Sequence, residues 1–476
     1  MGRAQEPREE VTMATDAQAA RGAPASGELA DFGYTQQLKR SLGLKDLLVY
    51  GLVFMAPTAP FAIFGPVFNV SHGMVPLVYL IGVVAMIFTA ISYREMSRAF
   101  PIAGSVYAYA GRGLSAPAGF LAGWAILLDY LLIPTLLYVT GAAAMSAIVP
   151  AIPEPAWVVF FVVVNTVINM LGIETTARAN RIMLAALLLV LAAFLVLAVI
   201  AIVQGVNGAH WSTDPIFNPA TFHPDMIFGA VSVAALSFLG FDAISTLAEE
   251  TKGGPKVVGR ATVLSLLIVA GMFIVQTYLA ALLLPGKTSF VGTEAINDAF
   301  YGVAHLVGGG TFKAIAALTV ALSAALADSL VAQAATSRLL FAMSRDGQLP
   351  RFLSHVHPKR RVPQRAVLLV GGLSVVLGIV FVGQVETLSS LVNFGALASF
   401  LLLHVTVFGY YIVKRRKRSY GMHLVIPLIG FVIIGYVLWN ADLHAKIGGL
   451  VWLAIGCVIL LVRKFTGRSI SLAQPS

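Results

Sequence analysis

The sequence predicts an all-α polytopic membrane protein with about twelve transmembrane helices. Its apolar residues make up 58% of the chain and its charged residues only 11%, less than half the roughly 25% of a soluble domain. Apolar stretches of about 20 residues, the length that crosses a bilayer, recur throughout. They lack the alternation of a membrane β-barrel, since every position from Leu184 to Ala201 is apolar.

The composition excludes several other classes of protein. A single cysteine, Cys457, rules out a disulfide scaffold or a zinc cluster. The net charge of +10 would suit nucleic-acid binding, but the basic residues lie in short runs between apolar stretches, which favours a membrane protein. The chain has no phosphate loop, nucleophile elbow or metal-spaced His/Cys cluster, so neither an enzyme nor a bound metal or cofactor is expected.

The predicted spans follow one another between two polar tails. Residues 1–40 are expected to be a disordered cytoplasmic tail, and residues 466–476 are expected to be a second cytoplasmic tail. The segment between them, 41–465, is predicted to form one helical domain. Its spans are expected at about 46–70, 75–97, 118–148, 156–173, 182–204, 226–249, 260–284, 311–343, 366–383, 387–413, 423–440 and 447–463.

The distribution of Lys and Arg predicts the orientation of this domain. If the N-terminus lies in the cytoplasm and the spans number about twelve, all but three of the 32 Lys and Arg residues fall on the cytoplasmic side. The exceptions are Lys287, Lys313 and Lys446. A wrong number of spans would break this alternation between inside segments rich in Lys and Arg and outside segments poor in them. The expected location is therefore the plasma membrane, with many spans and both termini inside.

Two of the spans are predicted to be broken helices. The first contains Pro57 and Pro60, which lack an N–H and clash with the preceding helical turn; a simple kink is the alternative. The sixth contains Gly240 beside Asp242 at mid-membrane depth. Broken helices at corresponding places in two halves indicate a secondary transporter. The two repeats and the added helices would cover about 46–204, 226–413 and 423–463.

Three acidic residues lie near the middle of predicted spans, where charge is rare and usually functional: Asp129, Asp242 and Asp328. No Lys or Arg is predicted at comparable depth, so ionised carboxylates would be unpaired. Either the carboxyl groups are protonated or a cationic substrate supplies the missing charge. Both alternatives suit a transporter that couples proton movement to an amine. For Asp129 a structural or gating role is favoured.

Three further titratable residues have simpler explanations. Glu249 and Glu250, at the cytoplasmic end of the sixth span, are expected to be a solvated helix end that pairs with Lys252 or Lys256. A role in an inner gate is the alternative. His404 stands alone on an apolar helix and is expected to be packed there rather than to relay protons.

Several short motifs carry a resemblance to a known family. They are Phe100-Pro-Ile-Ala-Gly-Ser-Val-Tyr-Ala-Tyr109, Gly119-Phe-Leu-Ala-Gly-Trp124 with Leu128-Asp-Tyr130, Ser237-Phe-Leu-Gly-Phe-Asp-Ala243 with Glu249-Glu-Thr251, Ser337-Arg-Leu-Leu-Phe341 with Ser344-Arg-Asp346, His357-Pro-Lys359, and Asn393-Phe-Gly-Ala396. Through them, residues 40–465 resemble the amino acid–polyamine–organocation superfamily of secondary transporters. Within it, the chain is most similar to bacterial putrescine importers.

The resemblance implies a LeuT-like five-plus-five inverted repeat, broken helices one and six, alternating access, and proton-coupled uptake of an amine or amino acid. It implies that Asp242 is a proton-sensing or amine-contacting group and that Tyr130 is an aromatic gate. The predicted proton-coupling groups are Asp242 and Glu249. The predicted substrate site consists of Thr58, Ala59, Pro60, Tyr130, Phe238, Gly240, Phe241, Asp242 and Asp328.

The chain departs from the family pattern at helix one. Pro57-Thr-Ala-Pro60 stands where most members have a Gly-Ser-Gly-like turn whose N–H groups hold a carboxylate, which weakens the case for an α-amino acid. Ala62 stands about where putrescine importers carry an Asp, and Asp328 where they carry a small neutral residue. Asp328 is therefore predicted to replace that carboxylate from the opposite wall of the cavity. Helix five lacks the central Lys of some relatives, which leaves coupling to Asp242.

The expected function is import of a small organic amine, putrescine or another polyamine, by proton symport. Asp242 and Asp328 would face the two ends of a diamine. The alternative is a proton-coupled amino-acid permease or an amino-acid/amine exchanger, with the backbone of Thr58 and Ala59 as its carboxylate site. A membrane sensor that binds without transport is a third class. The expected partners are a small molecule and the lipid bilayer, and no nucleic acid.

Overall fold

The computed structural model describes residues 27–466. Within this range the regular structure is helical, apart from one isolated parallel β-bridge between Leu42 and Thr251. Residues 27–37 belong to a separate unit and contain the short helix α2, Gly27–Ala30, whereas the residues from Leu38 onward form the helical bundle. The remainder of the two predicted tails, 1–26 and 467–476, lies outside the described residues.

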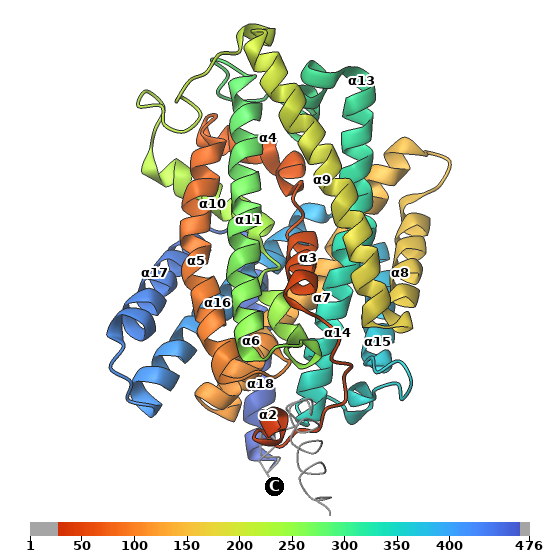
Figure 1. Cartoon of the computed structure of the whole chain (residues 1–476), viewed down its shortest axis with the longest axis vertical. Coiled ribbons are helices and arrows are strands. Elements are labelled where there is room, and N and C mark those ends of the chain that lie inside the picture. The colour runs from red at the N-terminus through yellow and green to blue at the C-terminus, as the bar shows by residue number, and fades with distance from the viewer. Residues whose placement is uncertain (1–26, 467–476) are drawn as a thin grey trace, which may run out of the picture. The chain divides into compact units, whose positions relative to one another are not determined.

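The helices of the bundle follow the order of the predicted spans (Figure 1). The α-helices are α3 Leu44–Phe54, α4 Ala59–Ser71, α5 Val75–Ala99, α6 Ser105–Gly113, α7 Ala116–Ile148, α8 Glu154–Leu171, α9 Ile173–Val203, α10 Pro224–Phe238, α11 Pro255–Leu282, α12 Thr293–Asn297, α13 Ala299–Leu322, α14 Ser329–Arg345, α15 Gln364–Val380, α16 Val385–Phe408, α17 Ile426–Trp439 and α18 Leu443–Phe465. Short 3-10 or π-helical segments are η1 Val206–Gly208, η2 Asp242–Glu250, η3 Ser323–Asp328, η4 Arg351–Ser354, η5 Gly409–Lys414 and η6 Gly421–Val425.

Several long helices begin with a proline in their first turn. The missing N–H has no partner there in any case, and the fixed φ suits the helix. These prolines are Pro76 in α5, Pro117 in α7, Pro155 in α8, Pro224 in α10 and Pro255 in α11. The starts of these helices predicted from hydropathy coincide with the observed starts or follow them by a few residues.

Among the described residues, 10 helical segments are long and apolar enough to cross a membrane. The bent pair of α3 and α4 makes an eleventh span, and α15, with 17 residues, is a shorter apolar helix. The predicted class, an all-α polytopic membrane protein, is confirmed. The count of twelve and the inverted repeat stay predictions.

The eighth span differs from the prediction at its start. It begins at Ala299 rather than near residue 311 and continues to Arg345. The reason is the run of three glycines at 308–310, which lowers the local hydropathy. Gly309 adopts the non-helical angles φ 69° and ψ −172°, so α13 consists of two helical stretches that meet at a kink, the second of which begins close to the predicted start.

Large apolar side chains face outward from the bundle. On α9, Ile182, Leu189 and Val203 are 67–72% exposed, and α8, α17 and α18 also have exposed valines and leucines. In water, apolar surface of this extent marks a contact with a partner or a membrane. The helices α7 and α10 are mostly buried, so they form the interior against which the lipid-facing helices pack.

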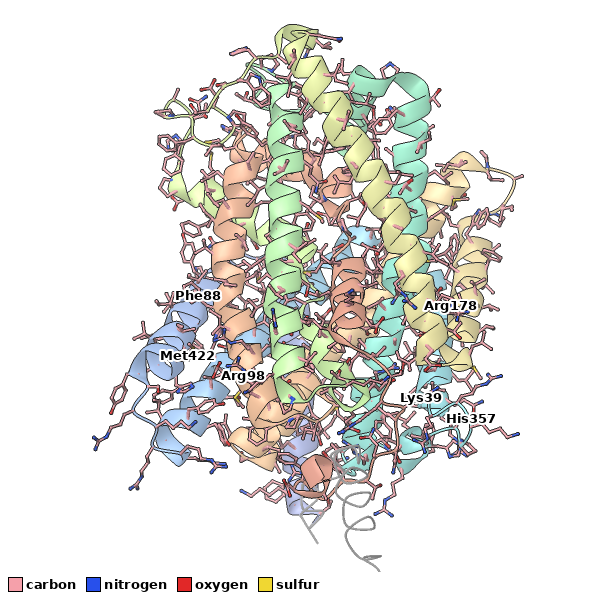
Figure 2. The ribbon with its side chains drawn as sticks, in the orientation of Figure 1. Lys39, Phe88, Arg98, Arg178, His357 and Met422 are labelled. Carbon is pink, nitrogen blue, oxygen red and sulfur yellow. The ribbon has the colours of Figure 1, made fainter. Side chains whose placement is uncertain are left out.

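Basic side chains gather at one end of the bundle. Figure 2 shows Lys39, Arg98, Arg178 and His357 toward its lower end. Lys39 Nζ lies 3.0 Å from Glu174 Oε1 in an exposed ion pair. The Lys/Arg distribution predicts that this end faces the cytoplasm, and we call it the basic end.

Candidate functional site

The first helix break lies between α3 and α4, whose axes differ by 44°. Pro57 cannot donate a backbone hydrogen bond, and Ala56 before it adopts a left-handed conformation with φ 44°. The chain turns through hydrogen bonds from Ala56 N–H to Val53 O and from Ala59 N–H to Ala56 O. The break expected from the prolines is present, and Pro60 belongs to the first turn of α4.

A side-chain amide from a neighbouring helix stabilises this break. Gln276 of α11 is buried and donates from Nε2 to Pro57 O at 2.9 Å. Without this donor the carbonyl would be left without a partner in apolar surroundings. The sequence analysis missed Gln276, although a single amide in an apolar span is a signal for a contact between helices.

The second break separates α10 from η2. Leu239 is extended, with ψ 140°, and Gly240 has φ 120°. A Cβ atom on Gly240 would lie 2.8 Å from Phe54 Cγ. Glycine is therefore needed here for two reasons: the backbone conformation and the close approach of α3. The break predicted at this glycine is present.

Both carboxylate oxygens of Asp242 accept hydrogen bonds. The Tyr130 hydroxyl donates to Oδ2 at 2.7 Å, and Gly240 N–H donates to Oδ1 at 3.3 Å. The side chains of Tyr130 and Asp242 are each only 1% exposed. The structure thus brings together these two predicted site residues, one from α7 and one from the start of η2.

Asp328 lies in a third irregular segment, the π-helical η3 between α13 and α14. The Ser323 hydroxyl donates to Asp328 Oδ1 at 2.9 Å. From α8, Asn165 donates through Nδ2 to Ala325 O at 3.2 Å and so supports the segment from outside. Single π-helical turns inside α-helices are rare and occur frequently at functional sites. The π-helical segment was not predicted, because the sequence has no local signature for this helix type. Asn165 was not predicted either, although, like Gln276, it is an amide in an apolar span.

A cavity of about 280 Å³ lies between the two breaks and η3. Its wall is formed by α3, α4, α7, α10, α13, η3 and the start of α16, and we call it the central cavity. Among the described residues that line it, Asp328 is the one that can ionise. The rest of the wall is apolar except for five hydroxyl side chains, those of Thr58, Thr140, Ser237, Ser323 and Ser389.

Three of the predicted substrate residues line the central cavity: Thr58, Ala59 and Asp328. Ala62 lines it too and so shares one cavity with Asp328. The remaining predicted residues are buried close to the breaks and do not line the cavity. They are Pro60, Tyr130, Phe238, Gly240, Phe241 and Asp242.

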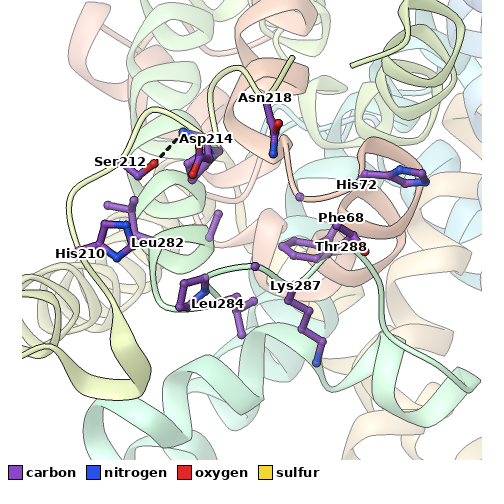
Figure 3. Close-up of a pocket in the computed structure, with 15 residues that line it drawn as sticks. Phe68, His72, His210, Ser212, Asp214, Asn218, Leu282, Leu284, Lys287 and Thr288 are labelled. Atoms are coloured by element: carbon purple, nitrogen blue, oxygen red, sulfur yellow. Dashed lines mark hydrogen bonds between the residues drawn. The ribbon is translucent and has the colours of Figure 1, made fainter. Parts of the chain in front are cut away.

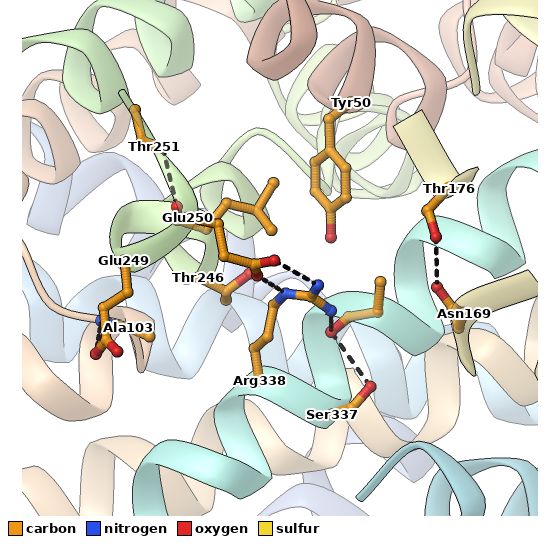
Figure 4. A network of polar contacts seen from close by, with 12 residues as sticks. Tyr50, Ala103, Asn169, Thr176, Thr246, Glu249, Glu250, Thr251, Ser337 and Arg338 are labelled. Carbon is orange, nitrogen blue, oxygen red and sulfur yellow. Dashed lines mark hydrogen bonds and ion pairs between the residues drawn. The ribbon is translucent and has the colours of Figure 1, made fainter. Parts of the chain in front are cut away.

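Two adjacent glutamates at the end of η2 are fully buried, and each pairs with an arginine of α14. Figure 4 shows the pair of Glu250 and Arg338. Arg338 donates to both carboxylate oxygens of Glu250, with Nη2 at 3.1 Å from Oε2. Arg345 donates to both oxygens of Glu249, with Nη2 to Oε1 at 2.7 Å and Nη1 to Oε2 at 3.0 Å. We call these four residues the Glu–Arg clamp.

The clamp corrects the expectation that Glu249 and Glu250 are a solvated helix end paired with Lys252 or Lys256. Their partners come from another helix, so the local sequence gave no sign of them. The clamp also corrects the assignment of Arg338 to a cytoplasmic connecting segment, because this residue lies inside α14. Glu249, predicted as a coupling group, is held in an ion pair.

Backbone hydrogen bonds join the two broken helices at the same end. Ser41 N–H and Leu42 N–H both donate to Glu250 O at 3.0 Å, and Lys252 N–H donates to Leu42 O at 2.7 Å. These bonds form the bridge between Leu42 and Thr251. The segment that leads into α3 is therefore fixed to the end of η2.

A second cavity, of about 170 Å³, lies among the loops that follow α4, α9 and α11, at the end opposite the basic end (Figure 3). His72, Asp214 and Lys287 are among its lining residues. Lys287 Nζ stands 3.8 Å from the centre of the Phe290 ring. None of the predicted site residues lines this cavity.

Asp129 and His404 are buried away from the central cavity. Asp129 Oδ1 has no hydrogen-bond partner among the described residues. His404 Nε2 lies 3.1 Å from Thr89 Oγ1, and Nδ1 lies 3.1 Å from Ser92 Oγ. Both ring nitrogens are thus engaged with α5, which agrees with the expectation of a packed histidine.

Comparison with known proteins matches the whole bundle. A family model described as "Amino acid permease" covers residues 47–463. The chain is 32% identical over 430 residues to the low-affinity putrescine importer PlaP of Escherichia coli, with 89% of this chain and 93% of that protein covered. It is 28% identical over 454 residues to the branched-chain amino acid permease BcaP of Bacillus subtilis and 27% identical over 463 residues to a methylthioribose transporter of the same organism. Both matches cover 89% of this chain and 93% of the relative.

Proposed function

The chain belongs to the amino acid permease family, and from this premise we propose that it imports a small organic amine by alternating access, with protons as the coupling ion. Members of this family are transporters rather than enzymes. The amine predicted from the sequence is putrescine or another polyamine. Putrescine is also the substrate in the name of the E. coli relative.

One observation carries the amine proposal: a single carboxylate faces the central cavity, and no cationic residue lines that cavity among the described residues. A buried carboxylate needs a positive partner or a proton. An ammonium group next to Asp328 would supply that partner. The C-terminal end of α3 borders the same cavity through Phe54 and Met55, and the end of a helix with its carbonyl groups also favours a cation.

For the coupling step we propose Asp242. It lies at the break of helix six and is hydrogen-bonded to Tyr130, so a proton taken up there would change the contact between η2 and α7. The Glu–Arg clamp would close the pathway at the basic end, which we propose to be cytoplasmic. A coupling role for Glu249 would require its separation from Arg345.

The alternative is an amino-acid permease, and one observation favours it. The N-terminal end of α4 borders the central cavity at Ala59, and the start of a helix attracts a carboxylate. Against it, Ala59 N–H already donates to Ala56 O, and the following residue is a proline without a donor.

The experiment that separates the two functions measures ligand binding to the purified protein by thermal stabilisation. Putrescine and n-butylamine represent the amines, and leucine represents the amino acids. We expect stabilisation by an amine and none by leucine, with loss of the amine effect in Asp328→Asn. Stabilisation by leucine alone, or unchanged amine binding in Asp328→Asn, would overturn the proposal.

Coupling is then measured in proteoliposomes. A labelled form of the bound amine should accumulate when an inward proton gradient is imposed and equilibrate without one. Vesicles without protein are the control, because neutral amines cross bilayers unaided. Equal uptake with and without the gradient would exclude proton symport.

A further inference from the structure

We infer that the transported amine carries one positive charge on an otherwise apolar body, so that the protein selects a primary monoamine over a diamine. This inference rests on the proposed function, because it concerns the number of charges on the amine. It departs from the sequence-based prediction in which Asp242 and Asp328 bind the two ends of a diamine.

The first step is the charge of the central cavity. Asp328 contributes its single carboxylate, and one oxygen of that group already accepts a hydrogen bond from Ser323. An ammonium group next to it would give one neutral ion pair. A second ammonium on the same molecule would have no carboxylate in the cavity wall.

The second step is the position of the other carboxylates in the bundle. Asp242 does not line the cavity, and each of its oxygens already accepts one hydrogen bond, from the Tyr130 hydroxyl and from Gly240 N–H. Asp129 is 3% exposed and does not line the cavity either. Neither group is placed to receive the far end of a diamine.

The third step is the apolar character of the remaining wall. From α7, Ile133, Leu136 and Leu137 face the cavity, and Ile63 and Val320 face it from α4 and α13. An alkyl or aryl body would remove this surface from water. The second ammonium of a diamine would lose its hydration there with only neutral hydroxyls and the carbonyl groups at the end of α3 as partners, and no second carboxylate, which is unfavourable.

The test compares amines of equal chain length on the whole purified protein. The pairs are n-butylamine with putrescine and n-hexylamine with 1,6-diaminohexane, and binding is read from thermal stabilisation over a concentration series. Binding is measured instead of uptake because neutral monoamines cross bilayers. In each pair we expect the monoamine to bind roughly tenfold or more tightly, the order of effect of one buried polar group left without a partner.

A substitution at Ala62 tests the same inference in the opposite direction. Ala62 lines the central cavity and is exposed to it, so a longer side chain has room there. Ala62→Asp adds a second carboxylate and should shift the preference toward the diamine by a similar factor. Ala62→Asn has nearly the same size without the charge and should keep the preference for the monoamine.

The outcomes separate this inference from the proposed function. Tighter or equal binding of the diamine by the unaltered protein would overturn the inference and leave an amine transporter in place. The same holds if Ala62→Asp and Ala62→Asn have one and the same preference. Binding of leucine but of none of the four amines would overturn both.

Discussion

Three carboxylates lie inside the bundle, and their surroundings differ. Asp328 faces the central cavity, Asp242 is bonded to Tyr130 and Gly240, and Asp129 is buried without a partner for Oδ1 among the described residues. The same residue type thus stands in three different environments. Substrate contact suits the first of these environments and coupling suits the second.

The coupling proposal predicts the behaviour of Asp242→Asn. The variant keeps a hydrogen-bond acceptor for Tyr130 but cannot gain and lose a proton, so gradient-driven accumulation should be lost while exchange of bound amine across the membrane persists. Both activities are measured in proteoliposomes. Asp129→Asn, at the carboxylate without a proposed substrate contact, is the comparison. Normal gradient-driven accumulation by Asp242→Asn would remove Asp242 from the coupling step.

Gly240 is the residue whose replacement should have the largest local effect on the backbone. Gly240→Ala places a Cβ at positive φ and against Phe54, and it should lower the free energy of unfolding by about 1–3 kcal/mol. Gly271 of α11 is the matched control, because a Cβ there meets no atom within 4 Å. Gly271→Ala should stabilise the protein by up to about 1 kcal/mol. Equal melting temperatures of the two purified variants would contradict this account.

At the scale of helices, the Glu–Arg clamp is the strongest electrostatic link between η2 and α14. Breaking a buried ion pair by removing one partner leaves an uncompensated charge. Glu250→Gln should therefore lower the free energy of unfolding by about 3–5 kcal/mol, as measured by denaturation in detergent. The control is Glu174→Gln, which breaks the exposed pair with Lys39 and should cost about 0–1 kcal/mol. If both variants lose an equally small free energy of unfolding, the clamp does not stabilise this conformation.

The broken helices could be predicted because their causes are local in the sequence. Pro57 and Gly240 favour a break through their own covalent structure. The π-helical segment that carries Asp328 has no such signature, since an apolar run reads the same in either helix type. The partner of Glu250 could not be predicted either. Arg338 lies far along the chain, and only the packing of α14 against η2 brings the two together.

At the scale of the whole molecule, the basic end predicts the orientation in the membrane. Hydropathy predicted the membrane class and the approximate positions of the helices, because a bilayer requires long apolar runs in each helix that crosses it. The central cavity could be predicted from the sequence only in part. Two broken helices indicate a cavity, but the sequence does not show that Asp242 is bonded to Tyr130 and stands outside the cavity wall.

The orientation predicts the accessibility of single cysteines in intact cells. Cys457 is exposed and is first removed as Cys457→Ala. A membrane-impermeant maleimide should then label His444→Cys, in the first turn of α18, from outside. Arg418→Cys, between η5 and η6, should be labelled only after the cells are permeabilised. The reverse pattern would invert the orientation and place the Glu–Arg clamp on the outer side.

The bridge between Leu42 and Thr251 has a consequence for sequence variation. It is made of main-chain N–H and C=O groups, which every residue type except proline provides in full. Exchange of side chains at Ser41 or Lys252 should therefore leave the link between the broken helices intact, whereas the buried side chain of Leu42 restricts that position to apolar residues. An inserted or deleted residue between Leu42 and Leu44 would shift its register. Outside Leu42, this link should thus tolerate a wide choice of amino acids and very little change in length.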